Sequence, residues 1–192
     1  MFFLAAGRFS SWALLILILI LILILSINSL DVELARKLEP RAASPKMRLA
    51  AVEALAKAGV PVGVLVAPII PALNDHEIPA VLAAAKAAGA GWACAEILRL
   101  PLTVAPIFEE WLERNVPEKK EKVLNRIRAM RGGKLNDARF GTRMRGEGIF
   151  ADQTWRMFEV ARRKAGLAGD APELSTAAFR RPEGAQLALG LW

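Results

Sequence analysis

Three arginines in a glycine-rich stretch are the residues of this chain best suited to contact an anion. Arg139, Arg143 and Arg145 fall within RGGKLNDARFGTRMRGEG (131–148), with a phenylalanine and a methionine between them. Guanidinium groups bind phosphates, and an interleaved aromatic ring on a flexible backbone suits contact with a single strand. The three arginines are therefore candidate nucleic-acid or substrate contacts. The same segment equally suits a loop that closes the mouth of a barrel.

Metal ligands are scarce in this sequence. Cys94 is the only cysteine and His76 the only histidine. An iron–sulfur cluster or a structural zinc takes about four ligands, most of them thiolates or imidazoles. The chain alone therefore contains no predicted metal site and no intramolecular disulfide. We expect His76 to face solvent in the first turn of a helix, and Cys94 to be a small buried side chain rather than a nucleophile.

Composition limits the size and the partners of the protein. The chain has 192 residues, 54% of them hydrophobic, which is enough for one domain but short of the roughly 250 residues of a complete (βα)8 barrel. Its formal net charge is +7 and its pI is about 10.1. This excess of positive charge favours anionic partners such as nucleic acid, phosphorylated substrates or acidic lipid, and it also fits a soluble domain with a basic face.

The N-terminal residues 1–25 form a low-complexity apolar segment whose core is WALLILILILILIL (12–25). A helix of that length would span only about 21 Å of a hydrocarbon core that is about 30 Å thick. Residues 9–27 reach the length of a span, about 19 residues, but include three serines. A buried parallel strand is also a continuous run of Ile and Leu. The segment is thus either a buried strand at its C-terminal end or a membrane span.

Residues 26–167 alternate between short strands and helices. Strands are predicted at 60–66 and 92–98, where β-branched or apolar residues are dense. The helices predicted between and before them cover residues 31–39, 44–58 and 76–88, with Asp31, Ser44 and Asp75 as N-caps. This spacing predicts βαβ units and a parallel sheet, so the fold class is α/β. Further helices are predicted at 106–115, 117–130 and 151–165, before a poorly ordered tail at 168–192.

Loops after the strands define the predicted active face. Ligands of parallel α/β proteins bind beyond the carboxyl ends of the strands. The loops in that position are residues 26–30, 67–75 and 99–101.

These loops and their flanks resemble one family, the radical S-adenosylmethionine (radical SAM) proteins of the spore-photoproduct-lyase-like group. The resemblance covers about residues 26–182. The segments on which it depends are SINSLD (26–31), LEPRAASP (38–45), PVGVLVAPIIPALNDHEIP (61–79), LRLP (98–101), FEEWLE (108–113) and RFGTRMRGEG (139–148).

The resemblance implies a partial parallel (βα) barrel, the C-terminal half of a TIM-like barrel with extra C-terminal helices. In this family the cofactors are S-adenosylmethionine and a [4Fe-4S] cluster, which a CxxxCxxC loop in the N-terminal half holds. No CxxxCxxC occurs in this sequence, which corresponds to the family from about the fourth strand onward. We therefore expect a radical SAM enzyme fragment that binds no cluster and is inactive by itself.

Cofactor contacts are also implied by the resemblance. Ser26 and Asn28 would offer a hydroxyl and an amide to S-adenosylmethionine, although both residue types also favour turns. Arg41 would bind a carboxylate, or else it pairs with the neighbouring Glu39. An apolar wall for the adenine would include Val66, Ala67 and Pro68, which core packing alone also explains.

Several partners follow from these interpretations: an N-terminal half-barrel that supplies the cluster, nucleic acid as in DNA-repair relatives, and other copies of this chain. A cytoplasmic location is expected, with membrane attachment through residues 9–27 as the alternative. Two other functions remain open at this point. They are a non-enzymatic basic module that binds nucleic acid, and a membrane-anchored remnant.

Overall fold

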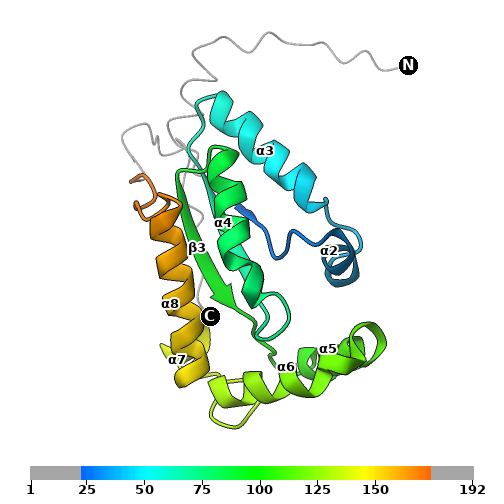
Figure 1. Ribbon diagram of the computed structural model, residues 1–192. Helices are drawn as coiled ribbons and strands as arrows, with labels where there is room; N and C mark the ends of the chain where they lie inside the picture. Colours follow the sequence, from blue (N-terminus) through cyan, green and yellow to red (C-terminus); the bar gives the residue numbers. More distant parts are fainter. Residues whose placement is uncertain (1–22, 174–192) are drawn as a thin grey trace, which may run out of the picture. The chain divides into compact units, whose positions relative to one another are not determined.

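A three-stranded parallel sheet organises the computed structural model, which describes residues 23–173 (Figure 1). The strands are β1 (Leu23–Ser26), β2 (Val62–Ile69) and β3 (Trp92–Ile97), in the order β1-β2-β3. Both pairings are parallel. The fold is therefore α/β, and the parallel pairing predicted between the segments 60–66 and 92–98 is confirmed.

Only the end of the apolar N-terminal run lies among the described residues, where Leu23–Ser26 forms β1. Residues 1–22 and 174–192 lie outside the description, and with them most of the predicted span and most of the predicted tail. Within residues 23–173, every helix is too short or too polar to cross a membrane.

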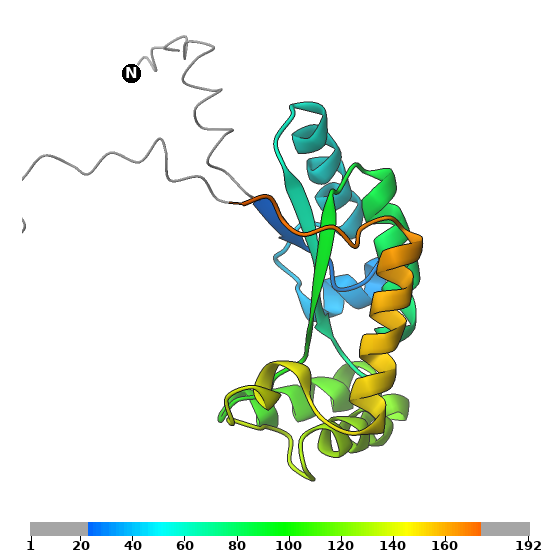
Figure 2. The same cartoon turned by 90° about the vertical axis from the view of Figure 1, so that its left-hand side faces the viewer.

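Helices cover one face of the sheet. Both crossover helices, α3 (Pro45–Lys57) and α4 (Ile78–Ala87), lie on this face, and α8 (Ile149–Lys164) packs beside α4 (Figures 1 and 2). Alternate residues of β2 point into the core beneath them, namely Val62, Val64 and Val66. The intervening residues point to the opposite face, which carries no helix within the described chain (Figure 2).

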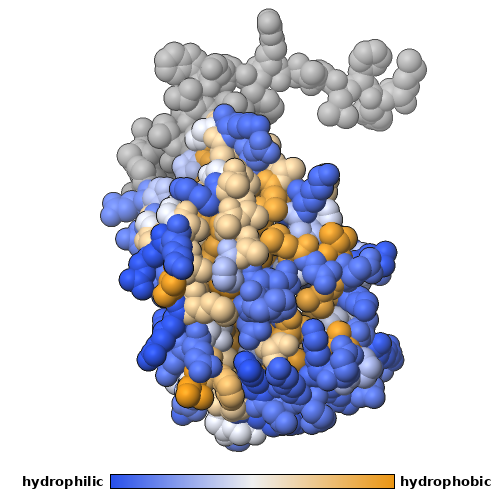
Figure 3. Space-filling view, in the orientation of Figure 1, coloured by the Kyte–Doolittle hydropathy of each residue, from blue (hydrophilic) through white to orange (hydrophobic). Residues whose placement is uncertain are grey.

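The outer surface of these helices is mostly hydrophilic, as expected for helices that face solvent. Figure 3 shows an apolar stripe over α4 and towards α8. The stripe coincides with a shallow groove between the two helices, lined by Pro79, Ala83, Met157, Val160, Ala161, Lys164 and Ala165.

The predicted caps are correct for two helices and wrong for the third. Asp31 accepts hydrogen bonds from backbone N–H groups at the start of α2 (Val32–Leu38), and Ser44 does the same for α3. Asp75, predicted to cap a helix beginning at His76, instead lies in a short 3-10 turn, and its carboxylate accepts from the N–H of Ala72. The α-helix begins at Ile78, because proline at the next position lacks the N–H that a helix interior requires.

A second apolar core lies beyond the carboxyl ends of the strands. It is formed by α5 (Val104–Asn115) and α6 (Pro117–Met130), which pack against Ile70, Leu73 and Leu100 from the loops that follow β2 and β3. The chain then forms a short helix that the sequence did not predict, α7 (Thr142–Arg145), which contacts β3 before α8 returns along the sheet (Figure 1).

Candidate functional site

Residues at the carboxyl ends of the three strands line an open hollow, to which each of the loops at 26–30, 67–75 and 99–101 contributes. Its polar groups are the Ser26 hydroxyl, the carboxylates of Glu39 and Glu96, and the Arg99 guanidinium. The complete lining is Ser26, Glu39, Ala67, Pro68, Glu96, Ile97, Leu98, Arg99, Pro101 and Val104. Such an arrangement of a few polar groups beside apolar walls is typical of a small-molecule site.

Asn74 holds two of these strand ends together. Its side chain is 3% exposed. The amide oxygen accepts from the N–H of Ile70 at 2.7 Å, while the amide nitrogen donates to the carbonyls of Asn28 at 2.7 Å and Pro68 at 3.0 Å. One buried side chain thus satisfies three backbone groups and fixes the loop after β1 against the loop after β2.

An arginine from α3 fixes the loop that follows α2. Arg48 donates to Glu39 Oε2 at 2.6 Å and to the carbonyl of Ser26 at 2.8 Å. The same Glu39 oxygen accepts from Asn28 Nδ2 at 3.1 Å. Because Arg48 is largely buried, this ion pair is better shielded from solvent than a surface pair. It holds the Glu39 carboxylate at the rim of the hollow.

The residues implied as cofactor contacts separate into two groups. Ser26, Ala67 and Pro68 line the hollow together. Asn28 is 5% exposed and its amide is committed to Glu39, whereas Val66 is 2% exposed and points into the core under the helices.

Arg41 lies away from the hollow and is exposed. The alternative pairing of Arg41 with Glu39 is not formed, since Glu39 pairs with Arg48 instead. The sequence did not point to Glu39, Arg48, Glu96 or Asn74 as site residues. Two signals were available in the sequence. Glu39 is a carboxylate within the LEPR segment, and Arg48 lies one helical turn after the Ser44 cap.

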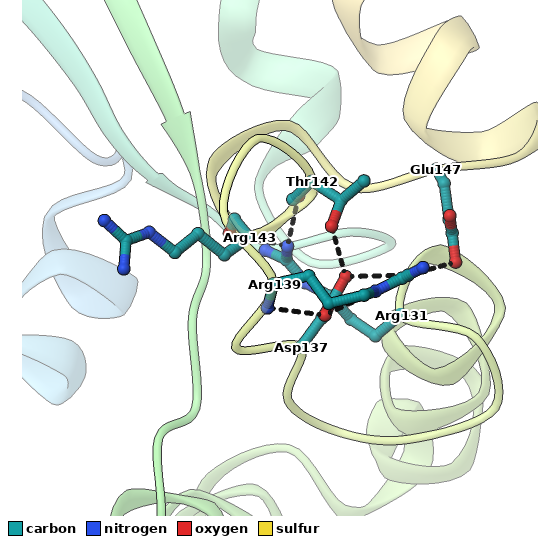
Figure 4. Close-up of polar contacts among 6 residues, drawn as sticks. All are labelled: Arg131, Asp137, Arg139, Thr142, Arg143 and Glu147. Atoms are coloured by element: carbon teal, nitrogen blue, oxygen red, sulfur yellow. Dashed lines mark hydrogen bonds and ion pairs between the residues drawn. The ribbon is translucent and has the colours of Figure 1, made fainter.

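Asp137 organises the arginine-rich segment between α6 and α8 (Figure 4). Its carboxylate accepts from the backbone N–H, Nε and Nη2 of Arg139, each at 3.0 Å, and from the Thr142 hydroxyl at 2.7 Å. Arg139 also pairs with Glu147 at 2.8 Å. The hydrogen bonds from Arg139 and Thr142 lower the pKa of Asp137 well below its usual range. Arg139 is consequently engaged within the segment itself.

Arg131 is a buried cation that ties this segment to the sheet. It is 3% exposed, and burial lowers its pKa. Its guanidinium donates to the carbonyls of Arg143 at 2.7 Å, Thr142 at 3.2 Å and Leu98 at 3.0 Å. Three carbonyl acceptors compensate much of the cost of removing the charge from water. They join α7 to the residue that follows β3.

The other two candidate arginines differ in their surroundings. Arg145 lies over the ring of Trp155 in α8, with its guanidinium carbon 4.7 Å from the ring centroid. Arg143 points away from the Asp137 cluster (Figure 4) and is 5.3 Å from the ring centroid of Phe140, a side chain that is 91% exposed. Of the three, Arg143 is the one whose backbone carbonyl shares the Arg131 guanidinium with the carbonyl of Leu98, a residue that lines the hollow.

Metal-binding chemistry has little support among the described residues. Within residues 23–173 there is no group of three or more His, Cys, Asp or Glu side chains that could hold a metal ion. Cys94 is half-buried in β3, where burial raises the pKa of its thiol. His76 is exposed, as expected.

Comparison with protein-family models gives no match, and neither the curated proteins nor the solved structures include a significant match.

Proposed function

We propose that this chain is the C-terminal part of a radical-SAM-type (βα) barrel, with its ligand site in the hollow at the strand ends. The structural observation that supports this proposal is the winding of the sheet. Consecutive strands are neighbours in the order β1-β2-β3, and both crossover helices lie on one face. A barrel is wound in this way throughout, with helices only outside, and each half of a doubly wound sheet is wound in the same way. The sequence resemblance is what favours the barrel.

On this proposal the face without helices is the inner wall of the barrel. It carries residues that alternate with the core positions, among them Gly63, Leu65, Cys94 and Glu96. Barrel active sites lie at the carboxyl ends of the strands. The hollow has the same position relative to this sheet.

The residues in the hollow fit part of S-adenosylmethionine. The Ser26 hydroxyl can bond a polar group of the nucleoside, and Ala67 with Pro68 offers an apolar surface to its ring. The Glu96 carboxylate suits the cationic amino end of the ligand. In the family that the sequence resembles, the bound nucleoside is the source of the radical chemistry. The part proposed for this chain is to bind and orient the nucleoside.

The residues of this chain do not fit an iron–sulfur cluster. Such a cluster takes three or four thiolates, and the sequence has one cysteine, whose thiol is half-buried. In the proposal, a separate N-terminal half-barrel supplies the cluster and pairs along the edge of β1 that lies opposite β2.

Complementation tests the proposal. The chain is incubated with iron and sulfide under reducing conditions, alone and with an N-terminal half-barrel that contains CxxxCxxC, and iron is then measured. Binding of S-adenosylmethionine is followed by calorimetry in the same samples. We expect iron and tight nucleoside binding only when both halves are present.

Two controls make the result decisive. A half-barrel with serines in place of its three motif cysteines should give no iron, and Ser26→Ala should weaken nucleoside binding without changing iron content. Stoichiometric cluster in the chain alone, or no gain from the added half, would contradict the proposal.

A further inference from the structure

Arg131 joins the backbone of two segments that each carry another arginine, Arg99 and Arg143. Its guanidinium donates both to the carbonyl of Leu98 at 3.0 Å and to the carbonyl of Arg143 at 2.7 Å. Arg99 follows Leu98 in the chain and lines the hollow. A second contact joins the same two segments, because Arg99 Nη1 lies 3.5 Å from the sulfur of Met144. A buried side chain thus fixes the backbone that carries Arg143 against the backbone that precedes Arg99.

Neither guanidinium is neutralised by an acid within residues 23–173. Arg99 has no ion pair there, and its buried Nε has no hydrogen-bond partner. The ion pairs of residues 23–173 do not include Arg143, whose guanidinium carbon lies 5.3 Å from the ring centroid of Phe140. By contrast, Arg139 is occupied by two carboxylates, Asp137 and Glu147.

We propose that Arg99 and Arg143 form a clamp for a phosphoryl group, which places a phosphate-bearing ligand at the mouth of the hollow. Two guanidinium groups provide planar, always-charged donors that match the tetrahedral oxygens of a phosphate. The net charge of +7 attracts such a ligand from a distance. The inference rests on the proposed function only in treating the hollow as the active face. It assigns no contact to Arg139.

Binding by the intact chain tests the clamp without any cluster. The probes are inorganic phosphate, measured by calorimetry, and a short single-stranded oligothymidylate, measured by fluorescence anisotropy. Arg99→Gln and Arg143→Gln should each weaken binding by roughly tenfold, the usual effect of losing one charged hydrogen-bonding group. Each should also reduce the salt dependence of oligonucleotide binding by about one charge.

Arg156→Gln is the matched control, because it removes the same charge from an exposed position on α8. It should change binding by less than about twofold. Arg143→Lys keeps the charge but not the planar fork, so it should restore only part of the affinity. Circular dichroism of each variant checks that the fold is kept.

The outcomes separate the sources of the phosphate. Tighter binding of the oligonucleotide assigns the clamp to nucleic acid, and comparable binding of inorganic phosphate assigns it to a small phosphorylated ligand. The inference is wrong if the unmodified chain binds neither probe, or if Arg156→Gln weakens binding as much as Arg143→Gln. Because these measurements need no cluster, they can fail while complementation by the half-barrel succeeds, and the reverse.

Discussion

Truncation of Asn74 to alanine should loosen the candidate site and destabilise the whole domain. Asn74 is 3% exposed, and its amide bonds the N–H of Ile70 and the carbonyls of Asn28 and Pro68. These backbone groups belong to the loops that follow β1 and β2. Alanine removes both polar atoms of the side chain and leaves the three backbone groups without their acceptor or donors.

The magnitude follows from those three bonds. A net hydrogen bond contributes about 1 kcal/mol, and a buried group left without a partner costs about 1–3 kcal/mol. Asn74→Ala should therefore lower the free energy of unfolding by about 3–5 kcal/mol, a large share of the roughly 5–15 kcal/mol of an ordinary domain. Asn74→Asp has nearly the same shape, but at neutral pH its carboxylate would face two carbonyl oxygens. We therefore expect a lower free energy of unfolding, which protonation of the carboxylate at low pH should partly restore.

Equilibrium unfolding in urea, followed by circular dichroism, measures these differences at an unchanged slope. The control is Asn125→Ala, because Asn125 is exposed and accepts a single bond from Arg128. That variant should lose less than about 0.5 kcal/mol. If Asn74→Ala lowered the free energy of unfolding no more than the control does, the three contacts would not be what fixes the two strand ends.

Other predictions concern the loop, the sheet and the assembly. The lowered pKa of Asp137 means that its stabilising contribution is complete above the ordinary carboxyl pKa of about 4 and is lost as the pH falls below that value. Unfolding midpoints should therefore drop as the pH falls from about 5 to about 2, and they should drop less in Asp137→Asn. Gly63→Ala should cost about 1–3 kcal/mol, because a Cβ there overlaps the indole of Trp92, whereas Gly91→Ala has room for the added carbon and should cost less in the same urea titration. The chain should self-associate through the sheet face without helices, where Ile24 is 48% exposed, and a single monomeric species in analytical ultracentrifugation would refute this.

Local signals predicted most of the secondary structure. Ser44 followed by proline indicates a helix start, and the dense valines of 60–66 indicate a buried strand. These two sequence signals predicted the positions of α3 and β2 to within a few residues. The start of α4 was missed because the capping preference of Asp75 was weighed without the proline at position 79, which determines where the helix can begin. Helix α7 was missed because its four residues lie among glycines and lack an apolar period.

The candidate site was predictable as a place but not as a set of contacts. Parallel strands bring their carboxyl ends together, so Ser26, Ala67 and Pro68 could be grouped from the order of the elements alone. The pairing of Glu39 with Arg48 depends on how α3 packs over β1, and no sequence spacing specifies it. The arginine-rich segment likewise required coordinates, because only they separate Arg139, which is held by acids, from Arg143.

Buried polar residues are concentrated around the strand ends. Within residues 23–173 they are Asn28, Ser29, Asn74, Arg131, Asp137 and Thr154, and all except Thr154 belong to loops or helix ends rather than helix interiors. A purely apolar core would be simpler to stabilise, since each of these groups must find its partners to avoid a desolvation cost. Two of them, Asn74 and Arg131, bond the backbone that frames the hollow, each on its own side. Such a network holds loops in one arrangement, and a fixed arrangement of loops is what a binding site requires.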